Sequence, residues 1–227
     1  MFATTDGSHA FWDGFLWGNR VPPKALFRKM LPEMIKILSL GELQKPALDS
    51  LADILLFGWL KWRTLKAPIV SDVTMREAIV QGGPQFGSQV LFNVKRRLVK
   101  SALSNEDLLW FSEKVWPLQK SLMCPEITRS LTDLLFESGP VFADLYRVIR
   151  TRLVPLQNFD FYGLKLSGPE GVIEQYPLEM LDLLERLLPQ DPRFWPHFTW
   201  DVLARLAKTD ALPDHLCLKR LNTALGR

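Results

Sequence analysis

Side chains that could hold a metal ion are few and scattered in this chain. Three histidines and two cysteines occur among its 227 residues. His215 and Cys217 lie two positions apart, but one such pair cannot complete a tetrahedral zinc site, and no regularly spaced residues supply the missing ligands. We therefore expect His215 to lie at the surface and Cys217 to be buried, and we expect the chain to bind no metal and no cofactor.

Nucleophile and phosphate-binding motifs are also missing from the sequence. It contains no G-x-S-x-G, and Cys124 precedes a proline at a predicted helix start with no histidine nearby. A helix N-terminus can activate a thiol, so Cys124 is the one residue that stays a candidate for reactivity. The stretch QGGPQFGSQ (81–89) lacks the Lys-Ser/Thr pair of a P-loop. It predicts a helix end, a turn and the start of a new helix.

Acidic residues are dispersed rather than paired. Asp53, Asp133 and Asp182 recur at equivalent positions of three similar segments, SLADILLF, SLTDLLF and MLDLLERLL. Single carboxylates in this setting indicate solvent-facing or inter-helix hydrogen bonds, because acid–base catalysis and metal-dependent cleavage both need clustered groups. We therefore expect a protein that is not an enzyme. A hydrolase such as a nuclease, or a regulator of one, is the alternative that stays open.

Basic residues, in contrast, cluster on two predicted helices. In VLFNVKRRLVKSAL (90–103) the basic side chains face away from the apolar ones, and a later helix has two arginines opposite its apolar face. A solvated surface is the simpler interpretation. If the two faces align, they form a basic stripe that could bind nucleic-acid phosphates, although no aromatic residue is interleaved with them for base stacking. The candidate contact residues for nucleic acid or a partner are Lys95, Arg96, Arg97, Lys100, Arg147 and Arg150.

Hydrophobic periodicity predicts helices along almost the whole chain. Apolar residues recur every three or four positions from Leu48 to Trp62, with Pro46 in the first turn, and no stretch shows the alternation of a strand. After Pro155 the pattern gives way to a long connection with one helical turn. The other predicted helices cover 74–82, 104–116, 125–138, 140–153, 178–188, 193–208 and 213–225.

Capping residues mark two of these helix starts. Thr74 with Glu77 forms a capping-box pair for the helix that ends at the glycines 82–83, and Ser104 with Asp107 marks a second start. Such pairs satisfy backbone N–H groups that have no partner inside the helix.

The similar segments and paired tryptophans predict a repeat. The tryptophans come in four pairs. The first two intervals between pairs are about the length of a two-helix repeat of roughly 40–47 residues, and the third is nearly twice that. We expect an all-α, HEAT-like right-handed solenoid of about ten helices. It would be one domain over 1–227, with sub-blocks 8–154 and 177–227 joined by the connection 155–176. The opening aromatic cluster, Phe11, Trp12, Phe15 and Trp17, would then be core of the first helical hairpin rather than a ligand cage.

Composition favours a soluble, cytoplasmic protein. The net charge of +3 is too small to indicate nucleic-acid binding by itself. The two cysteines, 124 and 217, are far apart, which favours reduced thiols over a disulfide scaffold. The most apolar run, 54–60, is too short to span a bilayer, so no membrane contact is expected.

The second half of the chain resembles a known group of proteins. The runs 115–166, with WPL, PEI and a break at VPL, and 171–189, with YP-x-x-x-L-x-L-L, resemble the C-terminal helical region of large bacterial anti-phage defence proteins. The run 11–31 is similar to an earlier helical hairpin of that region. In those proteins the region follows a sirtuin-like NAD-consuming domain or an ATPase module. Neither a Rossmann unit nor a P-loop occurs here, so the resemblance carries no catalytic residue to this chain.

These observations together predict a non-catalytic interaction or sensor module. It would bind a partner protein or a phage component and couple that event to an effector domain, attached or associated. A helical scaffold that binds nucleic acid through its basic faces is the alternative.

Overall fold

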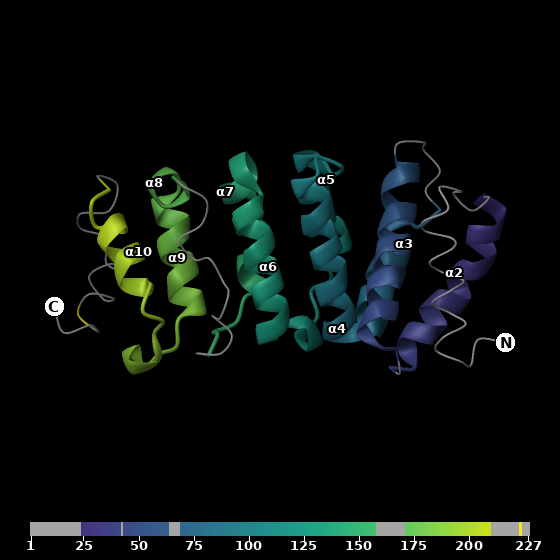
Figure 1. Cartoon of the computed structure of the whole chain (residues 1–227), viewed down its shortest axis with the longest axis horizontal. Coiled ribbons are helices and arrows are strands. Elements are labelled where there is room, and N and C mark those ends of the chain that lie inside the picture. The colour runs from purple at the N-terminus through teal and green to yellow at the C-terminus, as the bar shows by residue number, and fades with distance from the viewer. Residues whose placement is uncertain (1–23, 42, 64–68, 158–170, 210–222, 224–227) are drawn as a thin grey trace. The chain divides into compact units, whose positions relative to one another are not determined.

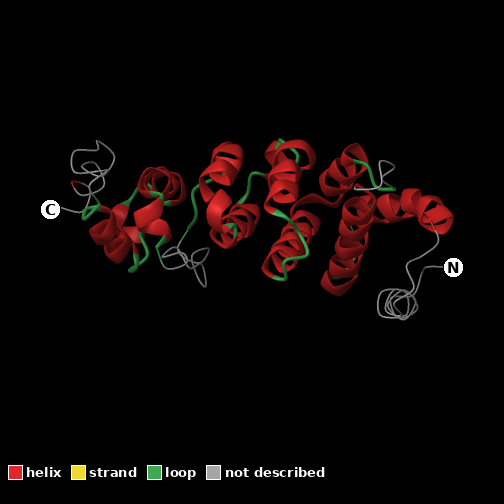
Figure 2. Ribbon diagram, turned by 90° about the horizontal axis from the view of Figure 1, so that it is seen from above, coloured by secondary structure: helices red, strands yellow, loops and turns green. Residues whose placement is uncertain are grey.

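Most of the residues that the structure describes lie in helices. The computed structural model describes residues 24–41, 43–63, 69–157, 171–209 and 223. Over these residues nine α-helices, α2 to α10, and several short 3₁₀ turns occur, and no strand does (Figures 1 and 2). The all-α prediction is confirmed. The predictions for the opening aromatic cluster, for His215 and Cys217 and for the C-terminal helix concern residues outside the described ranges.

The chain divides into two compact units. The first comprises residues 1–97 and 114–122, and the second comprises 98–113 and 123–227. This division lies near residues 98–123. The sub-blocks 8–154 and 177–227, joined by the connection 155–176, stay a prediction. That all 227 residues form a single repeat domain stays a prediction.

Two long helices build the core of the first unit. It contains α2 (Lys24–Ser39), α3 (Lys45–Arg63) and most of α4 (Asp72–Val99). The periodic apolar stripe predicted for α3 is buried at each position whose side chain is described, and Pro46 lies in the first turn as expected. From α4, Met75, Ile79, Phe86 and Val90 are fully buried. The buried stripe members of α3 are Leu48, Leu51, Ala52, Leu55 and Trp59.

Helix α4 bends where the glycine pair predicted a helix end. Gly83 has φ 64° and ψ −163°, a conformation that glycine adopts without strain, and Pro84 starts the second segment. The predicted cap at the start of α4 is wrong by one turn. Ser71, not Thr74, is the capping residue, because its Oγ accepts a hydrogen bond from the Thr74 N–H at 3.0 Å and the helix already begins at Asp72.

Short helices packed in pairs build the second unit. They are α5 (Asn105–Trp110), α6 (Pro125–Glu137), α7 (Phe142–Ile149), α8 (Val172–Gln175), α9 (Pro177–Leu187) and α10 (Thr199–Leu206). Helix α7 packs against α5 and α6, and α8 packs against α9 and α10. The predicted apolar face of α7 is buried, and Ser104 caps α5 through the Asp107 N–H as expected.

Two helix boundaries depart from the sequence prediction. Helix α5 passes into one turn of π-helix over Phe111–Val115. Helix α10 begins at Thr199 rather than near residue 193, because Pro196 lacks an N–H and interrupts the run. Among the described helices, none is both long and apolar enough to cross a membrane.

Candidate functional site

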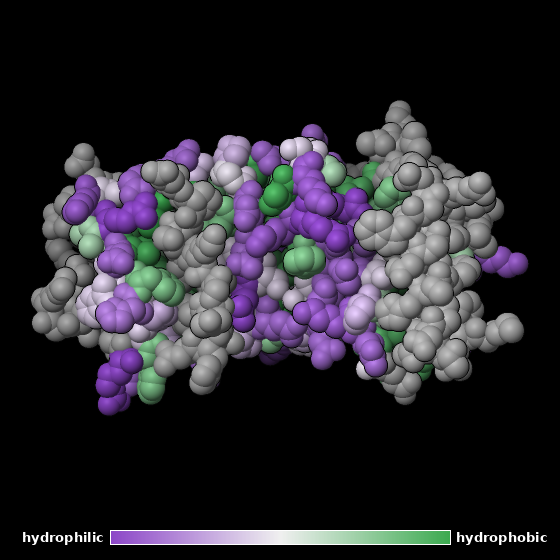
Figure 3. Space-filling model, in the orientation of Figure 1, coloured by the Kyte–Doolittle hydropathy of each residue, from purple (hydrophilic) through white to green (hydrophobic). Residues whose placement is uncertain are grey.

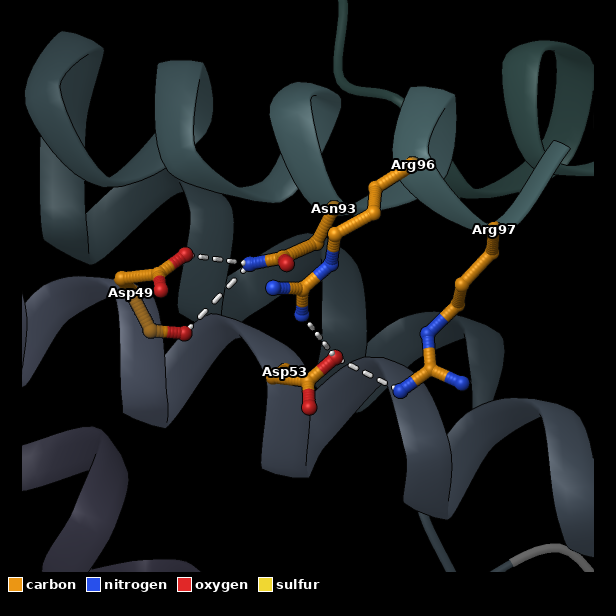
Figure 4. Close-up of polar contacts among 5 residues, drawn as sticks. All are labelled: Asp49, Asp53, Asn93, Arg96 and Arg97. Carbon is orange, nitrogen blue, oxygen red and sulfur yellow. Dashed lines mark hydrogen bonds and ion pairs between the residues drawn. The ribbon is translucent and has the colours of Figure 1, made fainter. Parts of the chain in front are cut away.

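A polar cluster joins α3 to the second half of α4 in the first unit. Asp49 and Asp53 project from α3, and Asn93, Arg96 and Arg97 project from α4 (Figure 4). Asp49 and Asp53 are four positions apart and lie on one face of α3, because such positions are neighbours on a helix surface. Asn93 and Arg97 share a face of α4 in the same way. The cluster contains two of the six basic residues that we singled out, Arg96 and Arg97, and Lys95 precedes them on α4.

Asn93 anchors one end of this cluster. Its Nδ2 donates to Asp49 Oδ1 at 2.9 Å and approaches the Asp49 carbonyl oxygen at 3.4 Å. The Asn93 side chain is fully buried, and its Oδ1 has no hydrogen-bond partner. A buried amide is costly unless it is bonded, so this contact constrains how α3 and α4 can pair.

Asp53 holds two arginines at the other end. The Arg97 Nη2 donates to Asp53 Oδ1 at 2.6 Å, and the Arg96 Nη2 forms an ion pair with the same oxygen at 3.0 Å. The Arg97 side chain is 19% exposed and the Arg96 side chain is 38% exposed. Two guanidinium groups therefore share one carboxylate, which leaves the group of three with one unit of positive charge.

The two contacts share a constant spacing along the chain. Asp49 to Asn93 and Asp53 to Arg97 are each 44 residues apart. A constant difference in residue number means that the two helix segments run in the same direction, because antiparallel partners would instead have a constant sum. The two segments are thus related by a shift of 44 residues.

The second unit repeats this arrangement with another spacing. The Tyr146 hydroxyl donates to Asp182, the Tyr176 hydroxyl donates to the Pro140 carbonyl, and Arg186 Nη1 donates to the Arg150 carbonyl. Each pair is 36 residues apart. The stretch 140–150 and the stretch 176–186 therefore run in the same direction in one register. Of the two roles expected for these carboxylates, solvent-facing or inter-helix hydrogen bonds, Asp53 and Asp182 take the inter-helix one.

Burial shapes the chemistry of this second cluster. The Tyr146 side chain is buried, and Asp182 also accepts from the Arg186 Nε at 3.2 Å. Burial, followed by the hydrogen bond to Asp182, raises the pKa of the Tyr146 phenol well above its ordinary value of 10.0. A phenol held in its neutral form, as a hydrogen-bond donor, fits a structural contact between helices.

The six basic residues are divided between the two units. Lys95, Arg96 and Arg97 belong to the first unit, and Lys100, Arg147 and Arg150 to the second. Within the second unit, Arg147 forms an ion pair with Asp144 at 2.7 Å, and Lys100 and Arg150 are exposed. Nucleic-acid or partner contact by the six residues stays a prediction. The structure adds that three of them, Arg96, Arg97 and Arg147, already have a carboxylate partner.

Two residues that the sequence reasoning passed over stand out in the structure. Phe92 is 53% exposed on the same helix as Arg96, which corrects the statement that no aromatic residue is interleaved with the basic ones. Arg152 is 5% exposed, and its Nη1 donates to the Ser112 carbonyl at 2.8 Å while its Nε has no partner. Burial lowers the pKa of the Arg152 guanidinium. The sequence held a signal for Phe92 alone, because it lies on the predicted polar side of its helix.

The groups that could perform chemistry do not gather in the described part of the chain. No set of three or more His, Cys, Asp or Glu side chains among those residues is arranged to hold a metal ion. Cys124 precedes α6 as its N-cap and is half-buried. Comparison of the chain with known protein families, with curated proteins and with solved structures found no match in any of the three.

Proposed function

We propose that this chain is a non-catalytic, HEAT-like helical-repeat module that binds a partner protein and passes that event to an effector domain. The observation that carries the proposal is the constant spacing of the inter-helix contacts, 44 residues in the first unit and 36 in the second. Parallel helices related by a fixed shift along the chain are what stacked two-helix repeats produce.

The use of the polar groups also favours an interaction module. The carboxylates of Asp53 and Asp182 both hold neighbouring helices together rather than meeting a second carboxylate. On the face that Figure 3 shows, the described residues are mostly hydrophilic, with separate small apolar spots. Stacked repeats expose long surfaces of this kind, on which a few apolar side chains act as anchors for a partner.

The bacterial defence context of the proposal rests on the resemblance of the runs 115–166 and 171–189. In that context the partner is a phage component or a host protein, and the effector is an attached or associated domain. We expect the module to act in the cytoplasm, because its two widely spaced cysteines favour reduced thiols.

Affinity capture followed by mass spectrometry tests the function. The tagged full chain is used as bait in bacteria with and without phage infection, and an unrelated helical protein of similar charge serves as the control bait. We expect one protein to be enriched specifically and to bind the purified chain at a fixed stoichiometry. The absence of any specific protein partner in both conditions would contradict the proposal, and metal-dependent hydrolysis by the pure protein would favour the hydrolase alternative.

A further inference from the structure

The C-terminal end of α5 departs from the α-helical pattern. Over Phe111–Val115 the helix continues as one turn of π-helix, in which an N–H donates to the carbonyl five residues before it. Such turns are rare and occur mostly at functional sites. Ser112 is buried inside this turn, and its Oγ donates to the Leu108 carbonyl at 2.9 Å. The backbone around Ser112 is therefore the part of α5 that a change of helical form would affect.

The π pattern provides no backbone donor for the Ser112 carbonyl. The residue five positions after Ser112 is Pro117, which has no N–H. The Arg152 Nη1 donates to this carbonyl instead, at 2.8 Å. In an α-helix the N–H of Trp116, four positions after Ser112, would be the donor. The π form of the turn therefore needs Arg152, whereas an α form would not.

Arg152 holds this carbonyl at a considerable cost. Its side chain is 5% exposed, its Nε has no hydrogen-bond partner, and it forms no ion pair with a carboxylate among the described residues. A guanidinium taken out of water without a counter-charge loses more than a single neutral acceptor returns. The contact therefore adds little net stability, and a small displacement of Arg152 is enough to open it.

A second arginine contacts the short turn that contains Arg152. This 3₁₀ turn, η4 (Arg150–Arg152), follows α7 directly. Arg186 of α9 donates to the Arg150 carbonyl through Nη1 at 3.5 Å and to Asp182 through Nε at 3.2 Å. All of these residues, and Ser112, belong to the second unit. A displacement of α9 would therefore move the turn that carries Arg152.

We propose that the contact between Arg152 and the Ser112 carbonyl is a conformational latch. While it is closed, the end of α5 keeps its π form. When η4 moves with α9 the contact opens, and the turn re-forms as α-helix with the Trp116 N–H as the new donor. This inference rests on the proposed function, since it supplies the step by which a binding event at one helix of the module reaches another.

A single NMR signal reports on the latch. Ser112–Glu113 is the one Ser-Glu pair in the sequence, so ¹³C-carbonyl serine combined with ¹⁵N glutamate marks this peptide bond alone in the full chain. Arg152→Met keeps much of the side-chain volume and removes the donor. We expect it to shift this signal, because the Ser112 carbonyl changes its donor. A crystal structure of the same variant should show α-helix in place of the π turn over Phe111–Val115.

Three further variants separate the latch from a merely structural contact. Arg152→Lys keeps a charged donor and should give a signal between those of the unchanged chain and Arg152→Met. Arg186→Gln should shift the signal in the same direction as Arg152→Met, although Arg186 contacts Arg150 and not Ser112. The matched control is Arg147→Gln, which removes an exposed arginine of α7 paired with Asp144 and should leave the signal unchanged.

Three results would overturn the inference. They are an unchanged NMR signal in Arg152→Met, a π turn that persists in its crystal structure, and no shift in Arg186→Gln. Arg152→Lys keeps the test open if Arg152→Met does not fold, because an unchanged signal there together with none in Arg186→Gln also refutes the latch. The capture experiment is independent of these signals. A partner captured by the unchanged chain, whose π turn does not respond to Arg152, would leave the interaction function standing and refute the latch alone.

Discussion

Trp59 combines the two roles that single residues have in this protein, since it fills the core and makes a specific polar contact. Its side chain is 1% exposed, and its Nε1 donates to Asp72 Oδ1 at 2.7 Å. Asp72 is the first residue of α4, so the contact ties α3 to the beginning of the next helix. Arg152 and Tyr146 are likewise buried, each with a polar group that must find a partner inside the protein.

Truncation of Trp59 should be severe. Trp59→Ala removes a fully buried indole and its hydrogen bond, and we expect a loss of about 3–5 kcal/mol in the free energy of unfolding. Trp59→Phe keeps most of the ring and loses the donor to Asp72, so it should cost about 1–2 kcal/mol. Urea denaturation measures both values. A nearly unchanged stability of Trp59→Ala would mean that this residue serves a binding surface instead of the core.

The buried charge of Arg152 should make its replacement by an apolar side chain favourable. Arg152→Met keeps much of the volume and removes a guanidinium that has the Ser112 carbonyl as its acceptor. We expect the free energy of unfolding to rise by about 1 kcal/mol, because the desolvation cost of the charge exceeds one hydrogen bond. Arg152→Ala should instead destabilise by leaving a cavity. If urea denaturation shows Arg152→Met to be the less stable protein, the Ser112 contact outweighs the desolvation.

Tyr146 should make stability fall at alkaline pH. Its pKa is raised in the folded protein by burial and by the hydrogen bond to Asp182, whereas in the unfolded chain it is near 10. The contribution is therefore fully present below about pH 10 and is lost as the pH rises above it, by up to about 1.4 kcal/mol per pH unit. Tyr146→Phe should remove this part of the slope. Urea denaturation from about pH 9 to pH 11 compares the two proteins, and parallel curves would contradict the assignment.

At the scale of helices, pairing depends on contacts between residues far apart in the sequence. Asp49 and Asp53 fix α3 against α4 with a spacing of 44 residues, and Asp182 fixes α9 against α7 with a spacing of 36. Apolar contacts are non-directional, whereas each of these polar contacts has one favourable geometry, so the polar contacts favour this register. Exposed ion pairs within a single helix, such as Arg147 with Asp144, have no such role.

Loss of the Asp53 carboxylate should therefore cost more than loss of an exposed one. Asp53→Asn leaves Arg96 and Arg97 without their counter-charge at a half-buried position, and we expect a loss of about 2 kcal/mol. The control is Asp144→Asn, which breaks an exposed pair within α7 and should cost less than about 0.5 kcal/mol. Thermal and urea unfolding of the two variants measure the difference. Equal losses would show that Asp53 does not fix the pairing of α3 with α4.

At the scale of the whole molecule, charge is spread rather than concentrated. The chain has a net charge of only +3, and its six candidate basic residues are divided between the two units. Carboxylates accompany Arg96, Arg97 and Arg147, which reduces the attraction that each can exert on a polyanion. Arg205 forms an ion pair with Glu174, and its hydrogen bond holds the pKa of the Glu174 carboxyl below its usual range. This pair balances one further positive charge.

Nucleic-acid binding should accordingly be weak or absent at physiological salt. We expect a gel-shift titration to show no complex with duplex or single-stranded DNA at about 0.15 M salt, and any complex at low salt to be independent of sequence. Joint replacement of Arg96 and Lys100 by glutamine should lower such binding alike for every sequence and leave stability nearly unchanged. Tight, sequence-dependent binding that survives added salt would favour the nucleic-acid alternative over the interaction module.

The amino-acid sequence by itself determined the helical class and most helix limits, because these depend on neighbours along the chain. Pro125 and Pro177 begin helices, Ser104 caps one and Gly83 breaks one, as their local chemistry requires. Only the tertiary structure decided which charged side chains are paired and which large side chains are buried. Arg97 meets Asp53 across 44 residues, and Phe92 is exposed. Arg152 is buried, and no carboxylate among the described residues pairs with it. These outcomes depend on which helix faces pack together, and periodicity within one helix carries no information about its neighbour.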